Sequence, residues 1–270
     1  MKNSSELSAE MSFWEHLDIL RNSLIRVAVA TVICGVVAFL FKEEVFGVIL
    51  APGQNTFVTY RILEQVGQIF TSVGIPEFSV RLINTGLAEQ FIIHMKISAY
   101  VGILLASPYI LYLLFRFISP ALYVREKQYV SQIVVGGYIM FLLGVLLCYF
   151  LIFPLTFRFL GTYQVSKEVE NMITLQSYIG TLTGMTMMLG FVFEIPVVCW
   201  LLARQGLISA SFMRRYRRHA FVVILMIAAV ITPTSDIFTL LLVALPVCSL
   251  YEISILIVKH SGKEQRKKRL

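Results

Sequence analysis

Six apolar stretches, separated by polar and basic segments, divide this chain. The predicted membrane spans are residues 24–41, 91–115, 133–153, 175–203, 220–231 and 237–258. A helix needs roughly 17–25 apolar residues to cross a bilayer, so the fifth stretch must use its flanks or lie in a thinned membrane. The pattern predicts an all-α polytopic membrane protein with six transmembrane helices, in which residues 1–270 form a single domain.

Prolines punctuate several of these stretches. Pro108 lies inside the second stretch, Pro154 directly follows the third, and Pro196 and Pro246 lie inside the fourth and sixth. Proline removes a backbone N–H and clashes with the preceding turn of a helix. We therefore expect Pro108 to break the second helix and the third helix to end just before Pro154.

Basic residues are distributed unevenly between the segments that connect the spans. Lys and Arg accumulate in cytoplasmic segments of membrane proteins, and this bias sets orientation. The enriched segments are the N-terminal end, the connections between spans two and three and between spans four and five, and the C-terminal tail. This pattern predicts that both termini are cytoplasmic. The longest connection, residues 42–90, then lies on the outer face, where short apolar runs between turn residues predict short helices over the outer mouth.

Composition supports a membrane protein and excludes several other classes. Hydrophobic residues make up 57% of the chain and charged residues 14%, against about 25% charged in soluble domains. Mean hydropathy is +0.78. The net charge of +7 follows the connections and the tail, which indicates contact with anionic lipid rather than nucleic acid.

Candidate chemistry for an enzyme is missing from the sequence. The four cysteines lie in separate apolar runs with no CxxC spacing, and the four histidines are scattered. No metalloprotease, nucleophile-elbow or phosphate-binding motif is present. We therefore expect no enzyme activity, no cofactor and no metal site.

Glu194 lies in the middle of the fourth apolar stretch, two residues before Pro196. A charged group at this depth costs roughly 2.5–3.5 kcal/mol on insertion scales, so it marks a candidate functional site. Two interpretations stay open. Glu194 either supports the kink as a protonated carboxyl bonded to a carbonyl freed by Pro196, or contacts a translocating substrate or partner helix. An alternative function, a proton-coupled small-solute transporter with Glu194 as its proton carrier, would need a polar cavity at the midplane.

Other polar residues near the spans allow simpler interpretations. Glu252 in the sixth span is expected to reach water or to pair with a basic residue. Asp236 precedes the same span and is expected to cap its first turn. Glu126, in the connection between spans two and three, either pairs with neighbouring basic residues or receives a basic ligand, because carboxylates bind guanidinium groups bidentately.

Several motifs together resemble the TatC family, the multi-spanning core of the twin-arginine protein translocase. They are Glu15-His-Leu-Asp-Ile-Leu-Arg21, Ser107-Pro108, Phe117-Ile-Ser-Pro-Ala-Leu-Tyr123 with Glu126, Tyr149-Phe-Leu-Ile-Phe-Pro154, Phe193-Glu-Ile-Pro196 and Thr232-Pro-Thr-Ser-Asp236. Their order and spacing among six spans cover most of the chain.

The resemblance implies a fold and a function. It implies a concave, cup-like bundle in the bacterial cytoplasmic membrane that binds the twin-arginine signal peptides of folded precursors. It also implies assembly with TatA/TatB-type single-span partners, driven by the proton-motive force, with this chain as a homo-oligomer inside a hetero-complex. In the family, the acidic residue at the position of Glu126 contacts the arginine pair. The positions of Glu194 and Pro196 lie where signal peptide or partner helices contact the concave face.

One position departs from the family pattern. The N-terminal motif of the family carries a glutamate that also contacts the signal peptide, and this chain has Ile19 there. Asp18 is adjacent, and Glu15 lies one helical turn earlier on the same face. The signal-peptide site expected from the resemblance therefore comprises Glu126, Asp18, Glu15 and Arg21, with Glu126 contributing most of the binding.

Overall fold

The computed structural model describes residues 13–70, 81–118, 130–166, 171–232 and 236–267, and nearly all of them are helical. The long elements are α1 (Phe13–Leu40), α4 (Glu89–Ile118), α5 (Val130–Leu147), α7 (Leu175–Val192) and α11 (Ile237–Lys267). The shorter ones are α2 (Lys42–Leu50), η1 (Ala51–Gly53), α3 (Val58–Phe70), β1 (Leu82–Ile83), η4 (Cys148–Ile152), α6 (Phe153–Thr162), β2 (Ile173–Thr174), α8 (Ile195–Arg204), α9 (Ala210–Arg215) and α10 (Arg217–Ile231). The predicted all-α membrane fold is confirmed.

Within the described residues, five helical stretches are long and apolar enough to cross a membrane. They are Leu17–Leu40, Glu89–Phe117, Ile133–Thr162, Leu175–Arg204 and Ile237–His260. They correspond to five of the six predicted spans. The remaining predicted span, residues 220–231, falls in α10, which has 15 residues and is not among the five. A sixth crossing therefore stays a prediction.

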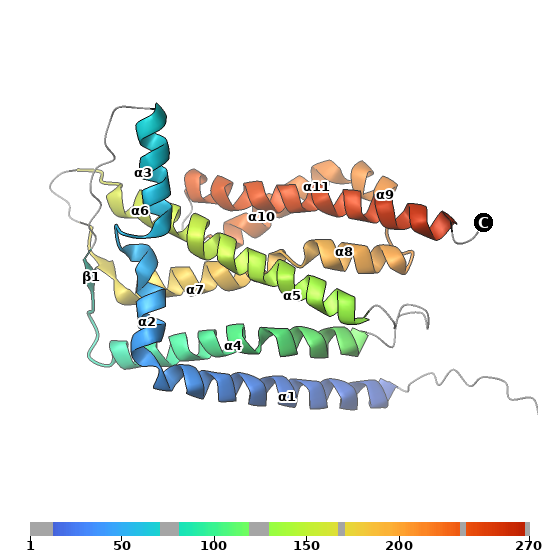
Figure 1. Cartoon of the computed structure of the whole chain (residues 1–270), viewed down its shortest axis with the longest axis horizontal. Coiled ribbons are helices and arrows are strands. Elements are labelled where there is room, and N and C mark those ends of the chain that lie inside the picture. Colours follow the sequence, from blue (N-terminus) through green and yellow to red (C-terminus); the bar gives the residue numbers. More distant parts are fainter. Residues whose placement is uncertain (1–12, 71–80, 119–129, 167–170, 233–235, 268–270) are drawn as a thin grey trace, which may run out of the picture.

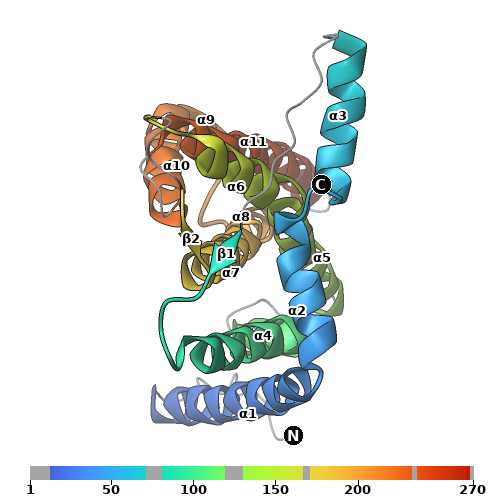
Figure 2. The same ribbon diagram turned by 90° about the vertical axis from the view of Figure 1, so that its left-hand side faces the viewer.

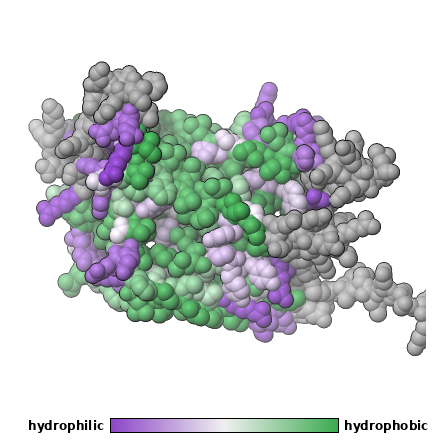
Figure 3. All heavy atoms as spheres, in the orientation of Figure 1, coloured by the Kyte–Doolittle hydropathy of each residue, from purple (hydrophilic) through white to green (hydrophobic). Residues whose placement is uncertain are grey.

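The long helices run roughly along one direction, and shorter elements close one end of the bundle. Figure 1 shows α1 and α4 side by side along one edge, with α2 crossing the end of the bundle. Seen from that end, α1 and α4 form a pair apart from α10 and α11, and α5 and α7 lie between the two pairs (Figure 2). Hydrophobic surface covers the middle of the face in Figure 3, with hydrophilic residues toward its two ends.

Glycines allow close approach between two pairs of helices, α4 with α1 and α5 with α7. A Cβ on Gly102 of α4 would come within 2.7 Å of the backbone nitrogen of Gly35 in α1. A Cβ on Gly144 of α5 would come within 2.8 Å of the Leu189 carbonyl oxygen in α7. Membrane helices gain little from apolar burial and rely on such close backbone approach. The main core comprises buried residues of α4, η4, α6, α7, α10 and α11, whereas α1 keeps much of its apolar surface exposed.

The prolines of the second and third spans do not end their helices, so both predicted interruptions are wrong. Pro108 lies inside α4, where the Ser107 hydroxyl donates a 2.6 Å hydrogen bond to the Leu104 carbonyl. That carbonyl is the one that the missing proline N–H would have reached. The third span passes through the π-helical segment η4 into α6 and continues beyond Pro154.

Short segments of the 42–90 connection pack on this π-helical region. Pro154 has no N–H to donate to the Phe150 carbonyl four residues earlier, and the Thr59 hydroxyl of α3 donates to that oxygen. The neighbouring Tyr60 hydroxyl lies 3.0 Å from the Pro154 carbonyl oxygen. The predicted short helices of this connection are confirmed as α2, η1 and α3.

A two-residue parallel strand pair, absent from our predictions, joins the 42–90 connection to the segment that precedes α7. Leu82 pairs with Ile173 and Ile83 pairs with Thr174, so β1 lies beside β2 just before α7 begins. Thr174 then caps α7, because its hydroxyl accepts a hydrogen bond from the Ser177 backbone N–H at 3.1 Å. This pair sets the starting point of the helix that leads to Glu194.

Candidate functional site

Helices α7 and α8 are separated by a turn at Phe193 and Glu194. The Glu194 N–H donates to the Phe191 carbonyl at 3.1 Å, and the Glu194 carbonyl accepts from the Val198 N–H at 3.0 Å. Pro196 lies in the first turn of α8, where its missing N–H has no helical partner to lose. The fourth span is thus two helices, and its carboxylate stands at the joint between them.

The carboxyl group of Glu194 is enclosed but not hydrogen-bonded. Both carboxyl oxygens are buried, and neither has a hydrogen-bond partner among the described residues. The bond to a freed backbone carbonyl that we considered from the sequence is therefore wrong for this part of the chain. A buried polar group without a partner costs free energy, so a donor supplied by another molecule would bind there favourably.

A glycine on α5 makes room for this carboxyl group. A Cβ added to Gly137 would come within 3.1 Å of Glu194 Oε2 and within 3.0 Å of the Phe115 ring. The carboxyl therefore lies against the backbone of α5, next to the end of α4. Sequence reasoning missed both contacts, although consecutive glycines inside an apolar stretch indicate close helix packing.

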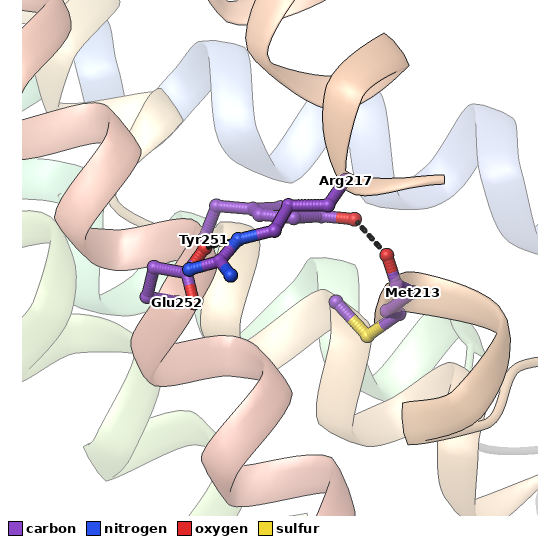
Figure 4. A network of polar contacts seen from close by, with 4 residues as sticks. All are labelled: Met213, Arg217, Tyr251 and Glu252. Carbon is purple, nitrogen blue, oxygen red and sulfur yellow. Dashed lines mark hydrogen bonds and ion pairs between the residues drawn. The ribbon is translucent and has the colours of Figure 1, made fainter. Parts of the chain in front are cut away.

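A second carboxylate, that of Glu252 in α11, forms an ion pair within the chain. Its Oε1 lies 2.5 Å from Nε of Arg217, the first residue of α10 (Figure 4). Beside it, the Tyr251 hydroxyl donates a 2.9 Å hydrogen bond to the Met213 carbonyl of α9. The predicted pairing of Glu252 with a basic residue is confirmed.

The predicted cap of the last span is also confirmed, because Asp236 Oδ1 accepts a hydrogen bond from the Thr239 N–H at 2.6 Å at the start of α11.

Three of the four predicted signal-peptide residues belong to the N-terminal part of α1. Asp18 and Arg21 stand on the first turns of α1 with side chains 69% and 70% exposed and 3.6 Å apart. Ile19 between them is also exposed. Glu15 lies in the first turn of the same helix, whereas Glu126 lies outside the described residues. The start of α1, the end of α4 and the start of α5 share this end of the molecule (Figure 1).

These features define a class of protein: an all-α, multi-spanning membrane protein whose distinctive polar group is a buried carboxylate at a broken helix. The described residues contain no cluster of three or more His, Cys, Asp or Glu side chains that could hold a metal ion.

Comparison with known proteins identifies the family. The family model of the Sec-independent protein translocase protein TatC matches residues 15–246. The TatC protein of Blattabacterium sp. subsp. Periplaneta americana is 33% identical over 98% of this chain and all of that protein. That of Desulforapulum autotrophicum is 34% identical over 94% of this chain and 86% of its own. A crystal structure of a twin-arginine translocase receptor, TatC, has a TM-score of 0.73 and 33% identity, and covers 92% of this chain and all of that one.

The chain belongs to the TatC family, so the resemblance inferred from its motifs is confirmed. It is a membrane-embedded component of the Sec-independent protein translocase and not an enzyme. The family assignment favours protein translocation over the alternative of a small-solute transporter.

Proposed function

We propose that this chain is the signal-peptide receptor of a twin-arginine translocase in the bacterial cytoplasmic membrane. It binds the twin-arginine signal peptides of folded precursors and nucleates assembly with TatA/TatB-type partners for export driven by the proton-motive force. The observation that carries the proposal is the similarity to a twin-arginine translocase receptor over 92% of the chain. In the membrane the chain acts as a homo-oligomer within that hetero-complex, surrounded by lipid.

Carboxylates of α1 and of the connection between α4 and α5 receive the arginine pair. Guanidinium groups bind carboxylates in a bidentate, charge-assisted geometry. Asp18 is exposed, and its ion pair with Arg21 is long, so an incoming arginine can replace Arg21 at little cost. Glu126 provides the main carboxylate, and Glu15, in the first turn of α1, contributes a further one.

The charges at this end of the bundle support a cytoplasmic location. Arg21, Arg116, Arg204, Arg214 and Arg215 belong to segments that share this end in Figure 1. Positive residues concentrate on the cytoplasmic side. Both termini are therefore cytoplasmic, and α10, although short, provides the sixth crossing within one domain of residues 1–270.

Glu194 serves a later step, in which a partner helix packs on the joint between α7 and α8. Its carboxyl oxygens are buried without a partner among the described residues, so a donor on an incoming helix satisfies them. Pro196 keeps the joint open by preventing one continuous helix through this point.

Site-specific crosslinking tests the receptor assignment. A precursor with a photoreactive residue beside its arginine pair should crosslink to this chain, and the same precursor with paired lysines should crosslink poorly. Glu126→Gln should reduce the arginine-dependent signal while the protein still inserts. Glu43→Gln, at the opposite end of the bundle, is the matched control and should leave it unchanged. Equal crosslinking of both precursors would contradict the proposal.

A further inference from the structure

A groove of about 470 Å³ lies between α5, α8 and α11, and Pro196, two residues after Glu194, is among its lining residues. Its walls are largely apolar and include Ile133 and Met140 of α5, Val197 and Trp200 of α8, and Ile257 of α11. Gly136 also lines it, and a Cβ added there would meet nothing within 4 Å. The two consecutive glycines therefore differ in their surroundings, since Gly137 lies against Glu194 and Gly136 borders the open space of the groove.

Arg204 is the charged residue among the described residues that line this groove. It is the last residue of α8, and its guanidinium lies 5.0 Å from the centre of the Trp200 ring. Trp and Arg side chains at the end of a membrane helix are typical of the boundary between hydrocarbon and head groups. The nearby α9 and α10 add Arg214, Arg215 and Arg218 to this end of the bundle.

The dimensions and charge of the groove decide between possible occupants. One turn of an α-helix, about 5.4 Å long and 10–12 Å wide, already fills about 500 Å³, so only side chains of a membrane-spanning helix, and not its body, fit in the groove. A flexible hydrocarbon chain fits apolar walls of this size. A guanidinium at one end adds a preference for a negative head group, as in basic sites between membrane helices.

We propose that this groove binds an anionic phospholipid from the leaflet at the Arg204 end, with one acyl chain against Gly136 and the phosphate beside Arg204. The proposal goes beyond the receptor function, because its ligand is a lipid and its polar contact is Arg204, although Pro196 lines the same groove. Its ligand is recognised by one apolar chain and one negative charge.

Trp200 provides a direct reporter for the test. The chain has two tryptophans, so Trp14→Phe leaves Trp200 as the single indole. This full-length variant is reconstituted in two sets of vesicles with equal proportions of phosphatidylglycerol and phosphatidylcholine. Bromine, which quenches indole fluorescence on contact, is carried on the acyl chains of the anionic lipid in one set and of the neutral lipid in the other. We expect about a fivefold preference for quenching by the anionic lipid, equivalent to roughly 1 kcal/mol for one basic residue.

Two variants and their matched controls locate the effect. Arg204→Gln should abolish the preference while keeping quenching by both lipids, whereas Arg218→Gln should keep the preference. Because Arg204→Gln also changes the surroundings of the indole, the quantity compared is the ratio of the two quenching constants within each variant. Gly136→Leu should fill the groove and reduce quenching by both lipids. Gly180→Leu, where a Cβ also meets open space but on α7, should not.

Three results would overturn the proposal. Equal quenching by both lipids in the Trp14→Phe protein would remove the anion preference. Unchanged quenching in Gly136→Leu, with circular dichroism showing a folded protein, would place the chain elsewhere. Relief of quenching by an added twin-arginine signal peptide, to the same extent with and without Arg204, would assign the groove to the peptide instead.

Discussion

Two carboxylates in apolar helices meet opposite surroundings in this molecule. Glu252 of α11 is paired at 2.5 Å with Arg217 and keeps 36% of its side chain exposed. Glu194, between α7 and α8, has both carboxyl oxygens buried without a hydrogen-bond partner among the described residues. Charged groups in membrane helices are costly and need a compensating interaction. For Glu252 the chain provides that interaction itself, and for Glu194 the described part of the chain does not.

The difference separates a structural role from a functional one. Arg217 begins α10, the helix too short to count among the candidate spans, so the pair with Glu252 holds this end of α10 against α11. Among the described residues, the Glu194 carboxyl makes no hydrogen bond that would hold an element in place. A group that stabilises nothing within the described structure, and that costs free energy to bury, is expected to contribute when another molecule arrives.

The largest expected effect separates these roles directly. Glu194→Ala should reduce transport of a folded reporter strongly, because losing a hydrogen bond to a charged or polar carboxyl group costs about 1.5–3 kcal/mol, or about 10- to 100-fold in partner affinity. Glu194→Gln should be milder because it keeps hydrogen-bonding capacity. Thermal unfolding in detergent should show no loss of stability in either variant. Wild-type transport and partner crosslinking in Glu194→Ala would leave only a local role for this residue.

Crowding the same carboxyl from α5 should give an intermediate effect. Gly137→Ala places a methyl group 3.1 Å from Glu194 Oε2 and 3.0 Å from Phe115, so the carboxyl or the ring must move. We expect partial loss of transport, measured with the same reporter. Gly136→Ala is the matched control, because its methyl group meets open space. Equal behaviour of the two variants would show that the position of the carboxyl is unimportant.

Breaking the ion pair between Arg217 and Glu252 should affect stability more than transport. Arg217→Gln or Glu252→Gln should lower the free energy of unfolding by about 1 kcal/mol, since the pair is hydrogen-bonded but partly exposed. Transport at permissive temperature should stay near the wild-type level. The charge-reversed double variant, Arg217→Glu with Glu252→Arg, should recover part of the loss in a double-mutant cycle. Lost transport without lost stability in Glu252→Gln would place this residue in the functional class instead.

The smallest effect is expected at the exposed end of α1. Asp18→Asn should weaken binding of a twin-arginine peptide only a few-fold, because the carboxylate is exposed and shared with Arg21. Ile19→Glu should strengthen binding by restoring the acidic residue typical of the family. A double-mutant cycle with Glu126→Gln measures whether the two carboxylates bind the same arginine pair. Unchanged affinity in both α1 variants would exclude this segment from the receptor site.

Hydropathy alone predicted most of the helices, but not how they continue through proline. The rule that proline ends a helix assumes that the freed carbonyl loses its partner. At Pro108 the preceding serine hydroxyl replaces that partner, and at Pro154 a threonine distant in sequence does so. The first replacement is local and visible as Ser107-Pro108. The second depends on tertiary contact, so no pattern near Pro154 indicates it.

The sequence identified Glu194 as the key residue of the candidate site, but it did not predict which residues surround it. A single carboxylate beside a proline in an apolar stretch identified Glu194, and a basic residue was expected for Glu252. The sequence does not show that Gly137 and Phe115 face Glu194, because this depends on how α4, α5 and α8 pack together. The strand pair before α7 was missed for the same reason, as two residues carry too little pattern to predict a strand.

The hydrogen bond from Thr59 to the Phe150 carbonyl has a consequence for the connection of residues 42–90. In a continuous α-helix every interior carbonyl already accepts one backbone hydrogen bond, so a passing hydroxyl can only share that acceptor. Pro154 has no N–H for the Phe150 carbonyl, and the Thr59 hydroxyl of α3 donates to that oxygen. The proline thus fixes the position along the helix at which α3 docks. Moving it by one residue would turn the free acceptor by about 100° around the helix, away from the segment that uses it.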